Sequence, residues 1–181
     1  MTQKQYAKQG KITDEMHEAA RYDNVTPQFI REGLEMGSIV IPKNIYHKFP
    51  ARAIGKGLST KINANLGTSE VRCNLKEEIE KLHIAFKYGT DSVMDLSTGG
   101  NLEHIRKTLL KESPIMFGTV PIYSVIYELL CQGKEITDMT KDLLFREIEK
   151  QTEAGVDFIT VHCGVTKETI RHLERSERVL G

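Results

Sequence analysis

The chain has 181 residues, of which 39% are hydrophobic and 28% charged, and its 25 basic residues balance 25 acidic ones. This balance gives no global basic field for nucleic acid or an acidic membrane surface, and the longest apolar runs are strand-sized, too short to cross a bilayer. The first residues carry no apolar signal-peptide core, so we expect a cytoplasmic protein.

Residues 1–50 are predicted to form a small helical N-terminal region. Its helix signals are two N-capping threonines and one terminating glycine: Thr13, Thr26 and Gly37. A short extended piece at 38–42 stops at a proline, and the glycine-containing residues 51–60 are predicted to be a linker.

From residue 61 onward, strand-like and helix-like segments alternate four times. The predicted strands cover residues 61–67, 92–98 and 158–164, and residues 115–123 are predicted to be a strand with its loop. The predicted helices cover residues 74–88, 102–111, 124–154 with a break near Gly133, and 166–177. Such alternation implies a parallel sheet in an α/β fold.

Polar residues fall at or just past the ends of the four predicted strands: Asn65, Asp95, Ser97, Tyr123 and His162. A barrel gathers its site from the ends of several strands, whereas an open doubly wound sheet concentrates its site at one switch point. We therefore predict the N-terminal half of a (β/α)8 TIM-type barrel. Residues 61–181 would supply its first four βα units, and four more would be needed to close it.

The segment 63–69, which joins the first strand to its helix, has two interpretations. In the functional one, Asn65 pairs with the edge of a polar heterocycle and the N–H groups of residues 67–69 meet an anion. In the structural one, the segment is a turn in which Asn and Thr side chains satisfy local backbone groups.

The segment 94–100, after the second strand, is equally ambiguous. A buried Asp95 would need a partner, and the paired glycines would let the backbone pass close to a ligand. Alternatively, the segment is a capping loop in which Ser97 or Thr98 caps the next helix.

Tyr123 and His162 close the third and fourth predicted strands. Tyr123 could present its hydroxyl to a site or pack in the barrel wall, and Pro121 should end its strand. His162 could bind a ligand anion or move a proton, although a hydrogen-bonded core histidine is commoner. Four other histidines are expected on helix surfaces: His17, His83, His104 and His172. The role of His47 is left open.

Three cysteines, Cys73, Cys131 and Cys163, lie 58 and 32 residues apart. This spacing fits no disulfide framework, metal motif or redox motif, so Cys73 and Cys131 are predicted to be buried or partly buried free thiols. The chain also lacks a phosphate loop and a dinucleotide-binding fingerprint.

Several segments together resemble the phosphomethylpyrimidine synthase family in their order and spacing. They are residues 38–42, 55–58, 61–69, 94–100, 113–114, 118–123 and 157–164, and the resemblance covers about residues 10–175. The resemblance implies a radical S-adenosylmethionine enzyme of thiamine biosynthesis. Such an enzyme uses a (β/α)8 barrel, a four-iron–four-sulfur cluster and zinc to convert 5-aminoimidazole ribotide into hydroxymethylpyrimidine phosphate. It also implies four substrate-binding residues, Asn65, Met94, Tyr123 and His162, while no catalytic residue is assigned.

The family's Ser-Arg-Gly-Gly phosphate loop, later barrel strands, zinc-binding histidines and three-cysteine motif have no counterpart in the chain. We therefore expect an N-terminal fragment that lacks the ligands for the cluster and zinc and is inactive alone. Two alternatives stay open: a fragment of the similar 5-hydroxybenzimidazole synthase of cobamide biosynthesis, and a non-catalytic ribotide-binding remnant. We expect no nucleic-acid or membrane partner, and either a homodimer or a need for a C-terminal partner chain.

Overall fold

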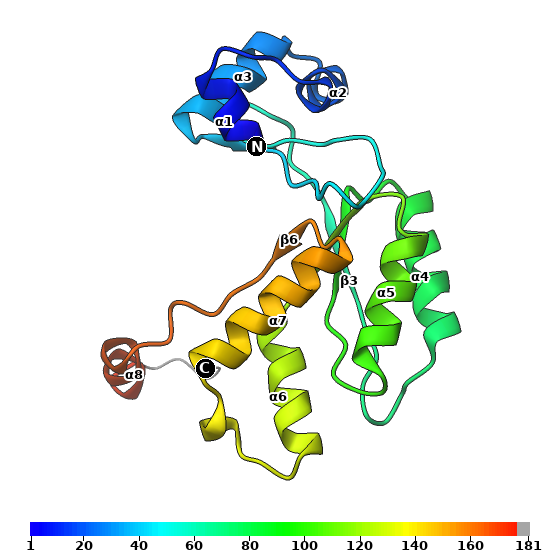
Figure 1. The fold of residues 1–181 in the computed structure, drawn as a ribbon, viewed down its shortest axis with the longest axis vertical. Coiled ribbons are helices and arrows are strands. Elements are labelled where there is room, and N and C mark those ends of the chain that lie inside the picture. The colour runs from blue at the N-terminus through cyan, green and yellow to red at the C-terminus, as the bar shows by residue number, and fades with distance from the viewer. Residues whose placement is uncertain (177–181) are drawn as a thin grey trace.

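The computed structural model describes residues 1–176, and Figure 1 shows its elements in two groups. Short helices form the N-terminal group, and a parallel sheet with its helices forms the second. A last helix, α8 (Lys167–Glu174), stands apart at the end of a long extended segment. Its predicted range, 166–177, ends outside the described residues.

Three helices build the N-terminal region: α1 (Gln3–Lys8), α2 (Asp14–Asp23) and α3 (Pro27–Met36). The predicted caps are confirmed, because the side chains of Thr13 and Thr26 each accept a hydrogen bond from the backbone N–H three residues on. Gly37 ends α3 in the left-handed conformation. The helices pack around buried apolar residues that include Ala7, Met16, Ala19, Ile30 and Leu34.

A two-stranded antiparallel sheet completes this region. Its strand β1 (Ile39–Val40) pairs with β2 (Ile54–Gly55), which lies within the residues predicted to be a linker. A Cβ atom at Gly55 would lie 2.2 Å from the carbonyl oxygen of Ser38, so this pairing requires glycine. The expected linker is thus partly folded against the N-terminal region.

The main sheet has four strands: β3 (Asn63–Leu66), β4 (Ser92–Asp95), β5 (Met116–Thr119) and β6 (Phe158–Ile159). They are parallel and adjacent in chain order. This confirms the predicted parallel α/β architecture. A closed barrel needs further strands, so the barrel itself stays a prediction.

Successive side chains of these strands point to opposite faces of the sheet. One face is covered by helices and carries apolar residues that pack into a single core with α4 and α5: Ala64, Leu66, Val93, Phe117 and Ile159. We call the opposite side the open face. Its residues, by register, are Asn63, Asn65, Ser92, Met94, Met116, Gly118 and Phe158.

Four helices follow or precede these strands: α4 (Leu75–Lys87), α5 (Leu102–Glu112), α6 (Pro121–Cys131) and α7 (Lys141–Ala154). The predicted break near Gly133 is confirmed, and a short 3-10 helix, η1 (Ile136–Asp138), lies in it. The predicted stop of the third strand at Pro121 is confirmed, because β5 ends at Thr119, but α6 begins at Pro121 and not at residue 124 as predicted. Proline has a fixed φ suited to the first helical position, so Pro121 also starts the helix.

Along residues 1–176, no helix combines the length and apolar character needed to cross a membrane, and the longest has 14 residues.

The N-terminal region is held against the sheet by buried charged groups. The carboxylate of Asp157, directly before β6, contacts Nδ1 of His47 at 2.6 Å and accepts hydrogen bonds from the backbone N–H groups of Asn44 and Phe117. Nε2 of His47 lies 2.8 Å from the carbonyl oxygen of Ser113. Both partners of the ring only accept hydrogen bonds, so this geometry favours the protonated imidazole, which can donate from both nitrogens.

The electrostatic surroundings of His47 also favour its protonated form. Burial opposes the charged ring, but its hydrogen bonds to Asp157 and to the Ser113 carbonyl outweigh that effect and raise the pKa of His47 above 6.5. Two further contacts join the same units: Lys61 pairs with Asp23, and the Tyr22 hydroxyl donates to Asp91.

We predict that His47 makes the stability of the chain pH-dependent. Because its pKa is higher in the folded than in the unfolded state, its contribution is complete below about pH 6.5 and is lost as the pH rises through the folded-state pKa. His47→Gln should lower the free energy of unfolding by about 2–4 kcal/mol at pH 6, and by less at pH 9, in urea titrations. His104→Gln, an exposed helical control, should change neither value, and equal pH slopes for His47→Gln and the wild type would contradict the assignment.

Candidate functional site

Asn65 and Met94 lie side by side on the open face. They are partners in the register of β3 and β4, each the third residue of its four-residue strand, and thus near the carboxyl end. Asn65 is exposed and Met94 is half-buried. The side-chain oxygen of Asn65 accepts a hydrogen bond from Asn63, so its amide N–H groups stay available to a ligand.

Tyr123 and His162 lie beyond the strands, and this corrects the prediction that they close them. Tyr123 belongs to the first turn of α6. His162 follows β6, which ends at Ile159, so the predicted strand 158–164 is observed only in its first two residues. The two rings nevertheless face each other, with centroids 6.0 Å apart and planes inclined by 34°.

Thr160 connects these two pairs. Its backbone N–H donates to the carbonyl oxygen of Thr119, which extends the sheet pairing past β6, and its hydroxyl donates to Sδ of Met94 at 3.2 Å. The segment that carries His162 therefore starts beside Met94. All four residues named from the resemblance lie on the carboxyl side of their strands, and their role in ligand binding stays a prediction.

The loop after β3 does not leave its N–H groups free for an anion. The N–H of Gly67 donates to the carboxylate of Glu78, that of Thr68 to Oγ of Ser97, and that of Ser69 to the carbonyl oxygen of Arg72. The anion-binding interpretation of residues 67–69 is therefore wrong. The turn interpretation is also wrong in its detail, because the hydroxyl of Thr68 donates to the distant carbonyl oxygen of Gly99 and the side chain of Asn65 pairs with Asn63.

The prediction that Ser97 or Thr98 caps the helix after β4 is wrong, because Asn101 caps α5. Ser97 instead donates its backbone N–H and its hydroxyl to Oδ1 of Asp95. Burial raises the pKa of Asp95, while these hydrogen bonds from Ser97 oppose the rise. The need for a partner at a buried Asp95 was thus predicted correctly, and the partner is two residues away.

All three cysteines, Cys73, Cys131 and Cys163, are free and exposed, so the predicted burial of Cys73 and Cys131 is wrong. Cys73 lies in the loop before α4 and Cys131 at the end of α6, where helix ends face solvent.

Within residues 1–176, no three side chains of His, Cys, Asp or Glu gather closely enough to surround a metal ion. We assign none of the described residues to a metal site.

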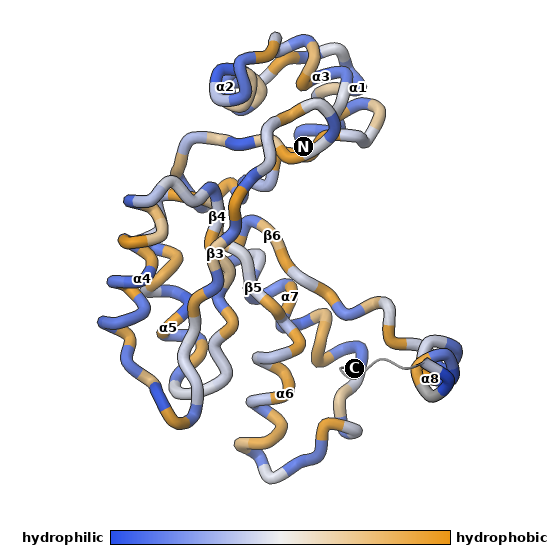
Figure 2. The backbone as a smooth tube through the Cα atoms, turned by 180° about the vertical axis from the view of Figure 1, so that it is seen from behind, coloured by the Kyte–Doolittle hydropathy of each residue, from blue (hydrophilic) through white to orange (hydrophobic). Residues whose placement is uncertain are grey.

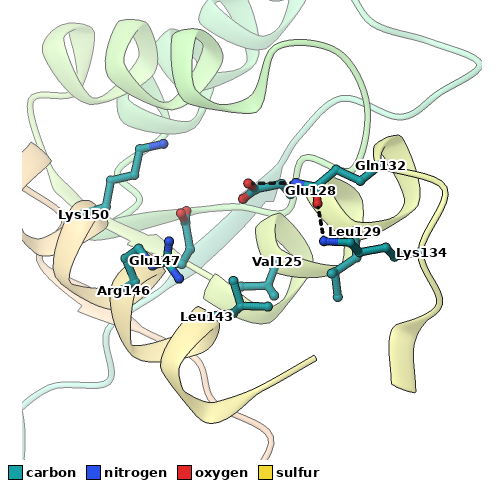
Figure 3. Close-up of a pocket in the computed structure, with 9 residues that line it drawn as sticks. All are labelled: Val125, Glu128, Leu129, Gln132, Lys134, Leu143, Arg146, Glu147 and Lys150. Atoms are coloured by element: carbon teal, nitrogen blue, oxygen red, sulfur yellow. Dashed lines mark hydrogen bonds between the residues drawn. The ribbon is translucent and has the colours of Figure 1, made fainter. Parts of the chain in front are cut away.

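Two cavities help to locate the site. One, of about 360 Å³, lies between the loops after β3 and β4 and helix α6, and Tyr123 is part of its wall together with Thr98 and Tyr127. The other, of about 160 Å³, lies between α6 and α7 (Figure 3). It contains none of the four predicted residues, and Glu147 and Lys150 in its wall already pair with Arg106 and Glu103. The carboxyl end of the sheet is thus the better candidate.

Comparison with known proteins agrees with the earlier resemblance. Residues 2–181 match the model of the Radical SAM ThiC family. The chain belongs to this family. The phosphomethylpyrimidine synthase of Thermoanaerobacter sp. (strain X514) is 48% identical to this chain, and the match covers 99% of this chain and 42% of the relative. The phosphomethylpyrimidine synthase of Syntrophus aciditrophicus (strain SB) is 50% identical, and the match covers 100% of this chain and 43% of the relative. The phosphomethylpyrimidine synthase of Pyrococcus furiosus is 46% identical, and the match covers 100% of this chain and 42% of the relative.

The chain thus spans about two fifths of the length of these members of the family.

Residue patterns alone missed two features of the candidate site of this chain. Met94 looks like a core residue in sequence, and only the resemblance singled it out. Thr160 was not singled out at all, because its contact with Met94 joins residues 66 positions apart.

We predict that Gly67 is required where the loops after β3 and β4 meet. Its φ is +147°, and a Cβ atom would lie 2.6 Å from the backbone nitrogen of Ser97. Gly67→Ala should therefore destabilise the chain by about 1–3 kcal/mol more than Gly89→Ala, measured by urea denaturation. Gly89 is a matched control, because its φ is also positive, at +83°, but its added Cβ would meet nothing within 4 Å. Equal losses in the free energy of unfolding for the two substitutions would contradict the close approach of Gly67 to the backbone of Ser97.

Proposed function

We propose that the chain forms the ribotide-binding part of a phosphomethylpyrimidine synthase, the thiamine-pathway enzyme that converts 5-aminoimidazole ribotide into hydroxymethylpyrimidine phosphate. Membership of the Radical SAM ThiC family supports this, as do relatives that carry the synthase name. Those names favour the pyrimidine product over the benzimidazole product of the sister family. The observation that carries the proposal is the position of Asn65, Met94, Tyr123 and His162 on the carboxyl side of four consecutive strands.

The chemistry of these side chains suits an aminoimidazole ribotide. The amide of Asn65 can donate to and accept from ring nitrogen and amine groups, and Met94 offers a soft, polarisable surface to the ring. The hydroxyl of Tyr123 and the imidazole of His162 can hydrogen-bond the ribose or the phosphate. These residues bind and orient the substrate.

In such an enzyme, bound S-adenosylmethionine and a four-iron–four-sulfur cluster supply the radical chemistry. The described residues of this chain offer no ligand set for the cluster, so we propose that conversion needs the portion of the relatives that this chain does not cover.

The first test of this proposal is ribotide binding. Asn65→Ala and His162→Ala should each weaken the binding of 5-aminoimidazole ribotide by about 0.5–1.5 kcal/mol, the usual net size of one hydrogen bond that competes with water. Ligand-observed NMR titration with the 181-residue chain suits the weak affinity that we expect. His172→Ala, on the exposed surface of α8, is the matched control and should leave the affinity unchanged. Unchanged affinity in both site variants would mean that these residues serve only the fold.

We further propose that the chain associates, either with a second copy or with a partner that supplies the rest of the barrel. Within the described residues β6 pairs on one side only, and unpaired strand edges favour association. Helix α8 packs against no other element through an extended contact, and its apolar residues Ile170 and Leu173 are 48% and 43% exposed. An amphipathic helix of this kind gains stability when its apolar side is covered.

Association is measurable by sedimentation velocity over a range of concentrations. The wild-type chain should form dimers or larger species as its concentration rises, and the double variant Ile170→Asp and Leu173→Asp should shift the distribution toward monomer, because it places charge on the apolar side of α8. Lys167→Asp, at the exposed start of the same helix, should have little effect. A wild-type chain that is monomeric at every concentration would contradict the proposal.

A further inference from the structure

A chain of side-chain hydrogen bonds joins the loops after β3 and β4. Oδ1 of Asp95 accepts from the backbone N–H and the hydroxyl of Ser97, and Oγ of Ser97 in turn accepts from the backbone N–H of Thr68 at 3.1 Å. The hydroxyl of Thr68 donates to the carbonyl oxygen of Gly99 at 2.7 Å. The residues Asp95, Ser97 and Thr68 are buried, with 7%, 7% and 2% of their surface exposed.

The place of this network in the sheet ties it to two of the proposed ribotide contacts. Asp95 follows Met94 directly and points to the helix-covered face, so holding Asp95 fixes the direction in which Met94 presents its side chain to the open face. Thr68 lies three residues after Asn65, in the loop that leaves β3. One carboxylate thus sets the relative position of two neighbouring strand ends.

Backbone contacts show how closely the two loops must fit. The N–H of Leu96 donates to the carbonyl oxygen of Leu66, and that of Thr98 to the carbonyl oxygen of Thr68, both at 2.8 Å. A Cβ atom at Gly99 would lie 2.4 Å from the carbonyl carbon of Ser69. Small displacements of either loop would therefore move the other.

We propose that Asp95 is a positioning residue of the ribotide site, which acts through Ser97 to hold Asn65 and Met94 in one arrangement. This inference rests on the proposed function. It adds residues that need not touch the ligand and that act from the opposite face of the sheet. A purely structural role would make a different prediction, since it would lower the stability of the chain without a specific effect on ribotide binding or on Met94.

The test uses Ser97→Ala in the 181-residue chain, with Ser113→Ala as a matched control. Ser113 is also a buried serine with a side-chain hydrogen bond, but it lies before β5, at the opposite end of the sheet. Ser97→Ala should weaken the binding of 5-aminoimidazole ribotide about two- to tenfold, the size expected for one lost hydrogen bond. Ser113→Ala should leave the affinity unchanged.

A double-mutant cycle separates positioning from general destabilisation. If Ser97 acts through Asn65, then Ser97→Ala should weaken ribotide binding less than twofold once Asn65→Ala is present, because coupled residues are not additive. Asp95→Asn keeps the oxygen that accepts from Ser97, so it should retain more affinity than Asp95→Ala. Effects of Ser97→Ala and Asn65→Ala that simply multiply, or equal losses in Ser97→Ala and Ser113→Ala, would overturn the inference.

A ligand-free measurement distinguishes this inference from the proposed function. With methyl-¹³C-labelled methionine, the Met94 resonance should shift in Ser97→Ala and stay in place in Ser113→Ala. If the wild-type chain does not bind the ribotide, the proposed function fails, and the Met94 resonance alone then decides whether Ser97 positions Met94. An unmoved resonance in Ser97→Ala overturns the inference.

Discussion

The carboxylate of Asp157 is the contact on which the arrangement of the chain depends. It joins three segments that are distant in sequence: the ring of His47, the backbone N–H of Asn44 and the backbone N–H of Phe117 in β5. Because Asp157 directly precedes β6, the same contacts fix where the last strand starts beside β5. Removing the ring of His47 would leave the buried carboxylate with only its two backbone N–H donors, and the loss of a charged partner in a core is costly.

Charged groups have different roles at the two ends of the sheet. At the amino end they join the N-terminal region to the sheet, as in the pair of Lys61 with Asp23, whose side chains are almost fully buried. At the carboxyl end the buried acid Asp95 turns away from the open face and holds its own loop. The open face is thereby free to carry neutral polar and soft side chains such as Asn65 and Met94, which suit a ligand better than an unpaired buried charge would.

Local signals in the sequence predicted the elements well, because their causes are local. A threonine before a helix caps it within three residues, as at Thr13 and Thr26, and alternation of strands and helices sufficed for the parallel order of the sheet. Where one residue has two effects, the sequence predicted only one of them: Pro121 was expected to stop its strand, as it does, but it also begins α6, three residues before the predicted start of that helix. The role of His47 had no local signal, since its partner Asp157 lies 110 residues away.

The candidate site lies on a surface, and under the proposed function this has an energetic consequence. Asn65 and His162 are exposed, so a ligand bound there would stay partly hydrated and its polar contacts would compete with water. The same contacts strengthen when the opposite wall of a site excludes solvent, because the effective dielectric constant falls. A chain that covers about two fifths of its relatives can therefore place ligand-facing side chains correctly and still bind weakly. Under the proposed function, positioning by Asp95 contributes to the affinity for the ribotide, and closure of the site would add to that affinity by excluding water from the same contacts.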